Sequence, residues 1–264
     1  MNLFESIVIA VVEGLTEFLP VSSTGHMIIA ERLLHVQETD FVKVFTVAIQ
    51  LGAILSVIVL YWKKFFDFSK IQFYIKLVIG VIPALLFGFL FNKKIDALLD
   101  SATTVAIALL IGGIVLLFVD NFFKNPTIYT DEEIKPKNAL LIGFWQCIAM
   151  IPGVSRSAAS IIGGMQQGLS RSLAAEFSFF LAVPTMLAAT GYKLLKYYKD
   201  FGGFSGEEIK MLAVGNVVAF VVALIAIKFF INFVKQYGFK IWGIYRIALG
   251  ILLLILIYTK VIEG

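Results

Sequence analysis

Two short polar motifs interrupt apolar stretches of this chain, and they hold most of the side chains that could do chemistry. Residues 13–26 combine two glutamates, a proline turn, four hydroxyl side chains and a histidine. Residues 152–157 combine a second proline turn with two serines and Arg156. Carboxylates and an imidazole move protons, and a guanidinium binds phosphate or carboxylate groups. The two motifs together therefore predict a site for an anionic substrate.

The acidic pair of the first motif is spaced for one helix face. Glu13 and Glu17 are four residues apart, so their carboxylates would be neighbours on a helix. Two like charges in an apolar segment repel each other unless a proton, a basic side chain or a divalent cation lies between them. Mg²⁺ and Ca²⁺ bind carboxylate and phosphate oxygens together, so either ion is a candidate cofactor held by Glu13 and Glu17. The alternative is an interfacial helix whose glutamates face water.

Hydroxyl side chains lead from the first proline turn to a histidine. His26 can act as a general base or acid, and Ser23 lies between the acidic pair and the imidazole, where it could serve as a nucleophile. Ser22, Thr24 and Gly25 would bind phosphate at the N-terminus of a short helix that begins near His26. The hydroxyls could equally cap that helix, and a lone histidine is often structural.

Arg156 is the strongest single signal in the sequence. An arginine at the centre of a membrane costs about 2.5–3.5 kcal/mol on insertion scales, so it needs a purpose there. Its planar fork can bind two phosphate oxygens at once, and Ser155, Ser157 and Ser160 could add hydrogen bonds to the same group. The alternative is a structural ion pair with one of the two glutamates, which would also bring the motifs together.

The elements that position these residues are predicted to lie in a membrane. Of the 264 residues, 59% are hydrophobic and 15% charged, against roughly 25% charged in soluble domains. We therefore expect an all-α polytopic membrane protein, in which residues 1–264 form a single membrane domain in contact with lipid. The net charge of +4 gives no reason to expect nucleic acid as a partner.

Six runs are long enough to cross a bilayer as helices, which takes about 20 residues. They lie near residues 43–62, 71–91, 104–123, 172–195, 208–231 and 241–260. The polar motifs lie in shorter apolar pieces at about 3–34 and 138–169, and such pieces are typical of re-entrant hairpins. Arg246 lies close enough to the end of its span to reach the interface.

The pattern of motifs and spans predicts that the two halves of the chain are related. A shift of 132 positions places the two proline turns on each other and Ser23 on Ser155. Residues 1–124 and 135–264 then each hold one hairpin and three spans, and an odd number of spans reverses the second copy. This predicts inverted-topology repeats whose hairpins meet near the midplane. Lys and Arg number nine on the side of the termini and twelve on the other, which leans towards termini outside.

Two classes of function fit these features. Inverted repeats with broken helices are common in transporters, and helix N-termini would suit a carrier or flippase of an anionic lipid. Catalysis is favoured because the carboxylates, the histidine and Ser23 share one hairpin, while Arg156 lies in the other. That arrangement indicates hydrolysis of a phosphoryl group on a membrane-embedded substrate.

The first motif resembles the acidic and serine-rich signature of the bacterial undecaprenyl-diphosphate phosphatases of the bacitracin-resistance family. Residues 13–26 carry that signature, and residues 152–157 resemble the second signature of the family. The resemblance extends to residues 176–179 and 219–228, so it covers essentially the whole chain. One position departs from the family pattern, because the second signature usually ends in Thr and this chain has Ser160.

The resemblance implies hydrolysis of undecaprenyl diphosphate, a polyprenyl diphosphate lipid, to undecaprenyl phosphate and inorganic phosphate, which recycles the lipid carrier of cell-wall synthesis. It also implies a divalent cation and a multi-pass protein of the bacterial plasma (inner) membrane, with an active site accessible from the outer face. The family's proposed roles fall on the acidic pair Glu13 and Glu17, the nucleophile Ser23, the base His26 and the phosphate-binding Arg156. Ser23 and an activated water both stay open as nucleophile, and a homodimer is compatible with the sequence but not indicated by it.

Overall fold

The computed structural model of the chain describes residues 1–99 and 101–262, without the side chains of residues 92–97 and 99. Residue 100 and residues 263–264 of the predicted domain lie outside the described residues. Within the described residues, regular structure is helical apart from one bridge between Ile128 and Leu169. The helices are α1 (Leu3–Thr16), α2 (Ser23–Leu33), α3 (Asp40–Ala48), α4 (Gln50–Leu60), α5 (Trp62–Phe65), α6 (Ile71–Leu99), α7 (Ala102–Phe122), α8 (Pro136–Ile148), α9 (Arg156–Gln166), α10 (Arg171–Phe201), α11 (Gly206–Tyr237) and α12 (Lys240–Tyr258).

Among the described residues, six helical segments are long and apolar enough to cross a membrane. They are α3 with α4, then Ile71–Phe91 of α6, α7, α10, α11 and α12, and each overlaps one of the six predicted spans. The prediction of an all-helical, multi-pass membrane protein is therefore confirmed. Helices α10 and α11 run to 31 and 32 residues, beyond the apolar runs that predicted them. The charged residues at their ends also favour helix, so these helices extend past the apolar run that spans the bilayer.

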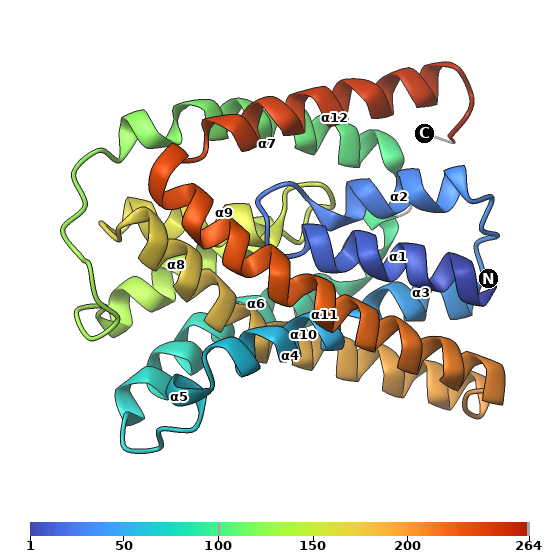
Figure 1. The fold of residues 1–264 in the computed structure, drawn as a ribbon, viewed down its shortest axis with the longest axis horizontal. Helices are drawn as coiled ribbons and strands as arrows, with labels where there is room; N and C mark the ends of the chain where they lie inside the picture. The colour runs from blue at the N-terminus through green and yellow to red at the C-terminus, as the bar shows by residue number, and fades with distance from the viewer. Residues whose placement is uncertain (100, 263–264) are drawn as a thin grey trace.

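The polar motifs lie between short helices. Helices α1 and α2 pack against each other, and so do α8 and α9. Helices of 11–14 residues are about 16–21 Å long, which is too short to cross a hydrocarbon core of about 30 Å. Figure 1 shows α1 and α2 at the same end of the molecule as both chain termini, while α8 and α9 lie towards the opposite end.

Local sequence signals set several helix starts. Asn2 and Glu5 form a capping box at α1, and Ser205 and Glu208 form one at α11. Pro136 occupies the first turn of α8, where its missing N–H costs nothing. These caps fix where the chain enters the helices that surround the polar motifs.

Helices from the two halves of the chain interlock. Helix α1 packs against α11, α8 against α6, and α7 against α12. Glycine makes two of these approaches possible: a Cβ on Gly143 would lie 2.2 Å from the Gly80 carbonyl oxygen, and a Cβ on Gly14 would lie 2.8 Å from that of Ala219. Each short pair is therefore held by a long helix of the other half.

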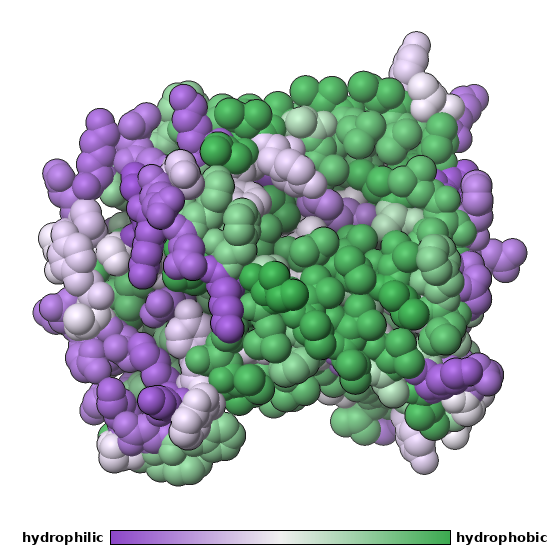
Figure 2. Space-filling model, viewed as in Figure 1, coloured by the Kyte–Doolittle hydropathy of each residue, from purple (hydrophilic) through white to green (hydrophobic). Residues whose placement is uncertain are grey.

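The surface matches a membrane environment. Large apolar side chains are exposed along the long helices, among them Phe89 and Phe229. Figure 2 shows hydrophobic residues over most of the middle of the molecule and hydrophilic residues at its two ends. Between α12 and α11, hydrophilic atoms are visible in a recess of this apolar face. The polar interior is thus reached from the side of the molecule that lipid would cover.

Candidate active site

The turns before α2 and α9 share an uncommon backbone conformation. Ser22 has φ 68° and ψ 100°, and Ser155 has φ 71° and ψ 116°. Both serines are N-caps in a region that non-glycine residues seldom adopt, and such conformations gather at functional sites. The structural equivalence is therefore Ser22 with Ser155 and Ser23 with Arg156. The predicted shift of 132, which aligned Ser23 with Ser155, is wrong by one residue here, because the second turn is one residue longer after its proline.

The carboxylate of Glu17 joins the two motifs. Its Oε1 accepts a hydrogen bond from Arg156 Nη2 at 3.0 Å, and its Oε2 accepts one from the Ser23 hydroxyl at 2.7 Å. The side chains of Arg156 and Glu17 are only 13% and 9% exposed, so the ion pair is largely shielded from solvent. The ion pair expected as a structural alternative is present, and it places the guanidinium beside the hydroxyl that could attack a phosphorus.

Arg156 is oriented by groups on α10 and in the first turn. Nη1 donates to the carbonyl oxygen of Ser178 at 3.1 Å, and Nη2 also contacts Met186 Sδ at 3.2 Å. The guanidinium lies over the Phe18 ring, with 5.5 Å between Cζ and the ring centroid. Its Nε is buried and has no hydrogen-bond partner among the described residues, which leaves a donor for a ligand. Ser178 was not a predicted site residue, because a backbone carbonyl leaves no mark in the sequence.

Ser157 and Ser160 are buried and bonded within the protein. The Ser157 hydroxyl donates to the Phe18 carbonyl oxygen at 2.8 Å and so ties α9 to the first turn. The Ser160 hydroxyl donates to the carbonyl oxygen of Arg156 at 2.8 Å and lies 2.6 Å from the Ser178 hydroxyl. Both serines therefore support Arg156, and their direct contact with substrate stays a prediction.

Glu13 is the least satisfied group in this region. Its side chain is fully buried, and neither carboxylate oxygen has a hydrogen-bond partner among the described residues. A buried carboxylate without a partner is costly, so a proton or a cation must balance it. The acidic pair therefore fits a hard cation such as Mg²⁺ or Ca²⁺. In the described part of the chain, no three His, Cys, Asp or Glu side chains lie close enough together to hold a metal ion, so phosphate or water oxygens would complete the coordination.

His26 is held away from Ser23. Its Nδ1 lies 2.8 Å from the Ser22 carbonyl oxygen, and its Nε2 lies 2.7 Å from the Tyr245 hydroxyl. A carbonyl only accepts, so Nδ1 carries the proton and a neutral ring accepts at Nε2 from Tyr245. The described contacts include no bond between His26 and Ser23, and the role of His26 as base stays a prediction. Tyr245, on α12, is a partner that no pattern in the sequence singles out.

The other predicted binding residues lie in the two turns and on α2. Ser155 accepts a hydrogen bond from the Ala158 N–H at 3.2 Å and so caps α9, whereas the Ser22 side chain makes no capping bond. Gly25 is buried against α7, where a Cβ would lie 3.0 Å from Leu109. Thr24 is half-buried on α2.

Arg246 differs from its predicted position. The sequence places it within reach of the interface, but its side chain is fully buried on α12. It donates hydrogen bonds to backbone carbonyl oxygens of both turns, which compensates the charge without reaching water.

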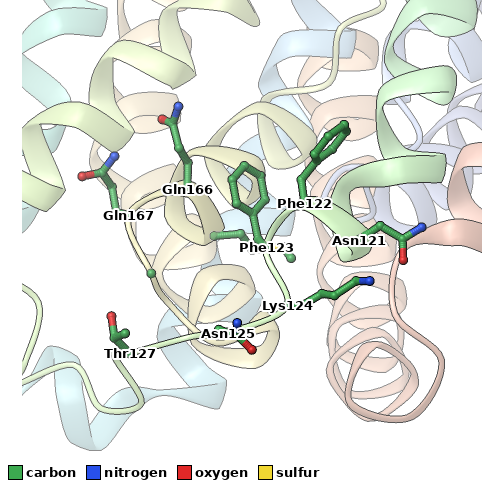
Figure 3. A pocket seen from close by; sticks show the side chains of 10 residues that line it. Asn121, Phe122, Phe123, Lys124, Asn125, Thr127, Gln166 and Gln167 are labelled. Carbon is green, nitrogen blue, oxygen red and sulfur yellow. The ribbon is translucent and has the colours of Figure 1, made fainter.

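A separate pocket of about 490 Å³ lies away from these residues, where the end of α7 meets the end of α9 (Figure 3). Its labelled polar side chains are Asn121, Lys124, Asn125, Thr127, Gln166 and Gln167. None of the predicted site residues lines it. This pocket is therefore distinct from the site between the turns.

Six apolar helices around a shielded carboxylate, arginine and serine define a multi-pass membrane protein with a polar site among its helices. Residues 6–252 match the model of the family described as bacitracin resistance protein BacA. The chain belongs to this family.

Curated relatives cover nearly the whole chain. It is 57% identical to an undecaprenyl-diphosphatase of Flavobacterium psychrophilum, over 97% of this chain and 96% of the relative. It is 52% identical to an undecaprenyl-diphosphatase of Porphyromonas gingivalis W83, over 99% of both chains. It is 49% identical to one of Bdellovibrio bacteriovorus, over 98% of this chain and 97% of the relative. The resemblance drawn from the two motifs is confirmed.

Proposed function

We propose that this protein hydrolyses undecaprenyl diphosphate to undecaprenyl phosphate and inorganic phosphate, and so recycles the lipid carrier of cell-wall synthesis. The observation that carries the proposal is the carboxylate of Glu17, which accepts from the Ser23 hydroxyl and from Arg156 at once. A nucleophile, a proton acceptor and a phosphate-binding cation thus meet within hydrogen-bond distance. The relatives named undecaprenyl-diphosphatase support the same reaction.

Binding of the diphosphate falls to the two turns. Arg156 exchanges part of its ion pair with Glu17 for oxygens of the terminal phosphate, and its free Nε supplies a further donor. The N-termini of α2 and α9 add unpaired backbone N–H groups and positive potential. Positioning and charge stabilisation of this kind supply most of the rate in phosphoryl transfer. The apolar tail stays against the exposed hydrophobic side chains of the long helices.

Attack then proceeds from the first turn. The proton of the Ser23 hydroxyl passes to Glu17 Oε2, the Ser23 oxygen bonds to the terminal phosphorus, and the bridging P–O bond breaks. Undecaprenyl phosphate leaves with the electron pair of that bond. Water then attacks the phosphoserine, releases inorganic phosphate and restores the serine. In the other form of the mechanism, the same carboxylate activates a water that attacks the phosphorus directly.

Glu13 and Glu17 would hold the divalent cation. A bound Mg²⁺ or Ca²⁺ neutralises phosphate charge and balances the two carboxylates. His26 would accept or deliver a proton during product release, which requires its Nε2 to leave Tyr245. Further contacts to the diphosphate would come from residues of the two turns and of helices α2 and α9, namely Ser22, Thr24, Gly25, Ser155, Ser157 and Ser160.

The same proposal includes an inverted-repeat architecture. Each short pair, α1–α2 and α8–α9, precedes three long apolar segments, and the pairs point in from opposite ends (Figure 1). The matching conformations of Ser22 and Ser155 support two copies of one hairpin. We propose that both pairs are re-entrant in the plasma (inner) membrane, with the site opening to the outer face. A homodimer stays a prediction, to be tested by mass measurement in detergent.

Transport of an anionic lipid is the second candidate function. The proposed inverted-repeat architecture favours it, because such repeats are common in transporters. The test is phosphate release from undecaprenyl diphosphate in detergent, with and without chelator, for the wild type and Glu17→Gln. Glu207→Gln is the matched control, because Glu207 is exposed in the first turn of α11. Release that needs metal and is lost only in Glu17→Gln supports the phosphatase. No release from folded wild type rejects it, and flux of the labelled lipid across vesicles then tests transport.

A further inference from the structure

Arg246 is a fully buried arginine whose guanidinium binds only backbone carbonyls. Nη1 donates to the carbonyl oxygens of Pro20 at 3.2 Å and Val154 at 2.8 Å. Nη2 donates to those of Gly153 at 2.9 Å and Ala108 at 3.1 Å. Its side chain has no exposed surface. One guanidinium therefore connects α12 and α7 with both polar turns.

The charge of Arg246 has no carboxylate partner among the ion pairs of the described residues. A buried charge is costly unless dipoles or an opposite charge compensate it. Four carbonyl dipoles do so here, and they would be left without these donors if the guanidinium were removed. An apolar residue would bury no charge but would leave these carbonyls without donors, so the guanidinium itself is what holds the two turns.

The bonded carbonyls stand next to the reacting residues. Pro20 lies three residues before Ser23, and Gly153 and Val154 come directly before Ser155 and Arg156. The same side chain thus fixes the backbone of the turn with the nucleophile and of the turn with the phosphate-binding group. We propose that Arg246 is a positioning residue that sets the distance between these two turns for phosphoryl transfer. This inference rests on the proposed phosphatase function.

The space around Arg246 is shaped for a guanidinium. A Cβ on Gly112 would lie 2.3 Å from Arg246 Nη2 and 2.7 Å from its Cζ. Gly112→Ala therefore displaces the guanidinium without removing its charge. Gly191, on α10, provides a matched Gly→Ala control, because a Cβ at that position would have nothing within 4 Å.

Lysine cannot replace this fork. An ammonium is a compact charge that cannot reach four carbonyls spread around a planar group. Arg246→Lys should lower kcat about 100-fold, the size of loss expected from a misplacement of about 1 Å. KM should change less than about threefold, because Arg156 still binds the diphosphate. Arg32→Lys is the matched control, since Arg32 also donates to a backbone carbonyl, that of Val261, but is exposed.

The test measures phosphate release from undecaprenyl diphosphate and amide hydrogen exchange for five variants beside the wild type. They are Arg246→Lys, Gly112→Ala, the double variant, Arg32→Lys and Gly191→Ala. Arg246→Lys and Gly112→Ala should each lower kcat and speed exchange at residues 17–22 and 149–155. In the double variant the smaller ammonium relieves the clash with the added methyl group, so its loss should be less than the product of the single losses. Both controls should match the wild type.

Each contrary result is distinct. If folded wild type releases no phosphate, the phosphatase function itself is rejected. Amide exchange at the two turns then still shows whether Arg246 holds their backbones. Normal kcat in both single variants, or a rise in KM with kcat unchanged, overturns the positioning role. If Arg246→Lys does not fold, Gly112→Ala decides, because it keeps every charge and hydrogen-bonding group of the chain.

Discussion

Ser23 and Arg156 are the first residues of two short helices, and their side chains bind the two oxygens of the same carboxylate. Each follows a serine with positive φ, and Glu17 lies between them, 2.7 Å from the Ser23 hydroxyl and 3.0 Å from Arg156 Nη2. Matching positions of two turns with similar backbone conformation thus carry different chemistry, a hydroxyl in one and a guanidinium in the other. The site arises only where the turns face each other.

Removal of the guanidinium should almost abolish turnover. Arg156→Ala removes the charge that stabilises the transferred phosphate, and loss of one such group costs about 100- to 1,000-fold in kcat. Arg156→Lys should recover little, because an ammonium cannot keep the bonds to Glu17 and to the Ser178 carbonyl together. Steady-state phosphate release measures both, with the fold of each variant checked by size-exclusion chromatography. Turnover near the wild-type rate in Arg156→Ala would remove this residue from the site.

Ser23→Ala distinguishes the two mechanisms. If Ser23 is the nucleophile, the variant should bind the lipid and release no phosphate above background. Rapid acid quenching of the wild type with a substrate labelled in the terminal phosphate should then trap a labelled protein. Ser69→Ala, in a surface turn, is the control. A residual rate of about one tenth or more with no trapped label would instead assign the attack to water.

The fold was predictable to the extent that bilayer thickness dictates it. The six spans follow from apolar runs of about 20 residues, and the predicted ranges coincide with them. The junction of the two motifs rests on a contact between residues 139 positions apart, which no local pattern specifies. Charge alone suggested it, because the first motif carries two glutamates and the second carries Arg156, a charge of the opposite sign.

The supports of the site were harder to predict. Arg246 binds carbonyl oxygens, and every residue has a carbonyl, so the sequence holds no partner to look for. An arginine within an apolar span was the available signal. The contact between His26 and Tyr245 was also missed, because several tyrosines lie near span ends and nothing in the sequence distinguishes Tyr245 from the others.

The hydroxyls of Ser160 and Ser178 should be coupled. They lie 2.6 Å apart in a fully buried position, so Ser160→Ala or Ser178→Ala alone leaves a polar group without its partner. Each single change should cost about 1–3 kcal/mol of stability, and the double change should cost less than their sum. Thermal unfolding in detergent of the wild type, both single variants and the double variant measures this coupling. Additive losses would contradict the coupling, and Ser160→Ala should impair turnover less than Arg156→Ala.

The loop between the halves should respond to pH through Glu133. The backbone N–H groups of Tyr129 and Thr130 donate to its carboxylate at 2.7 and 3.1 Å, and these bonds lower the pKa of Glu133 below its ordinary value of 4.5. A lowered folded-state pKa means that the contribution to stability is present above pH 4.5 and is lost as the pH falls through the lower value. Glu133→Gln should therefore speed proteolysis of residues 126–135 at pH 7 and lose that effect in acid. An effect of equal size at both pH values would exclude the carboxylate as its source.

Glu13→Gln should show whether Glu13 holds the divalent cation. The wild-type carboxylate is buried without a partner, so the neutral amide should raise the unfolding temperature in chelator by removing an unbalanced charge. Addition of Mg²⁺ or Ca²⁺ should stabilise the wild type, because a ligand that binds only the folded state shifts its unfolding, and should leave Glu13→Gln unchanged. Glu207→Gln, at an exposed position, should respond to the ion as the wild type does. An equal shift with Mg²⁺ in Glu13→Gln and the wild type would place the cation elsewhere, and the buried carboxylate would then have to carry a proton.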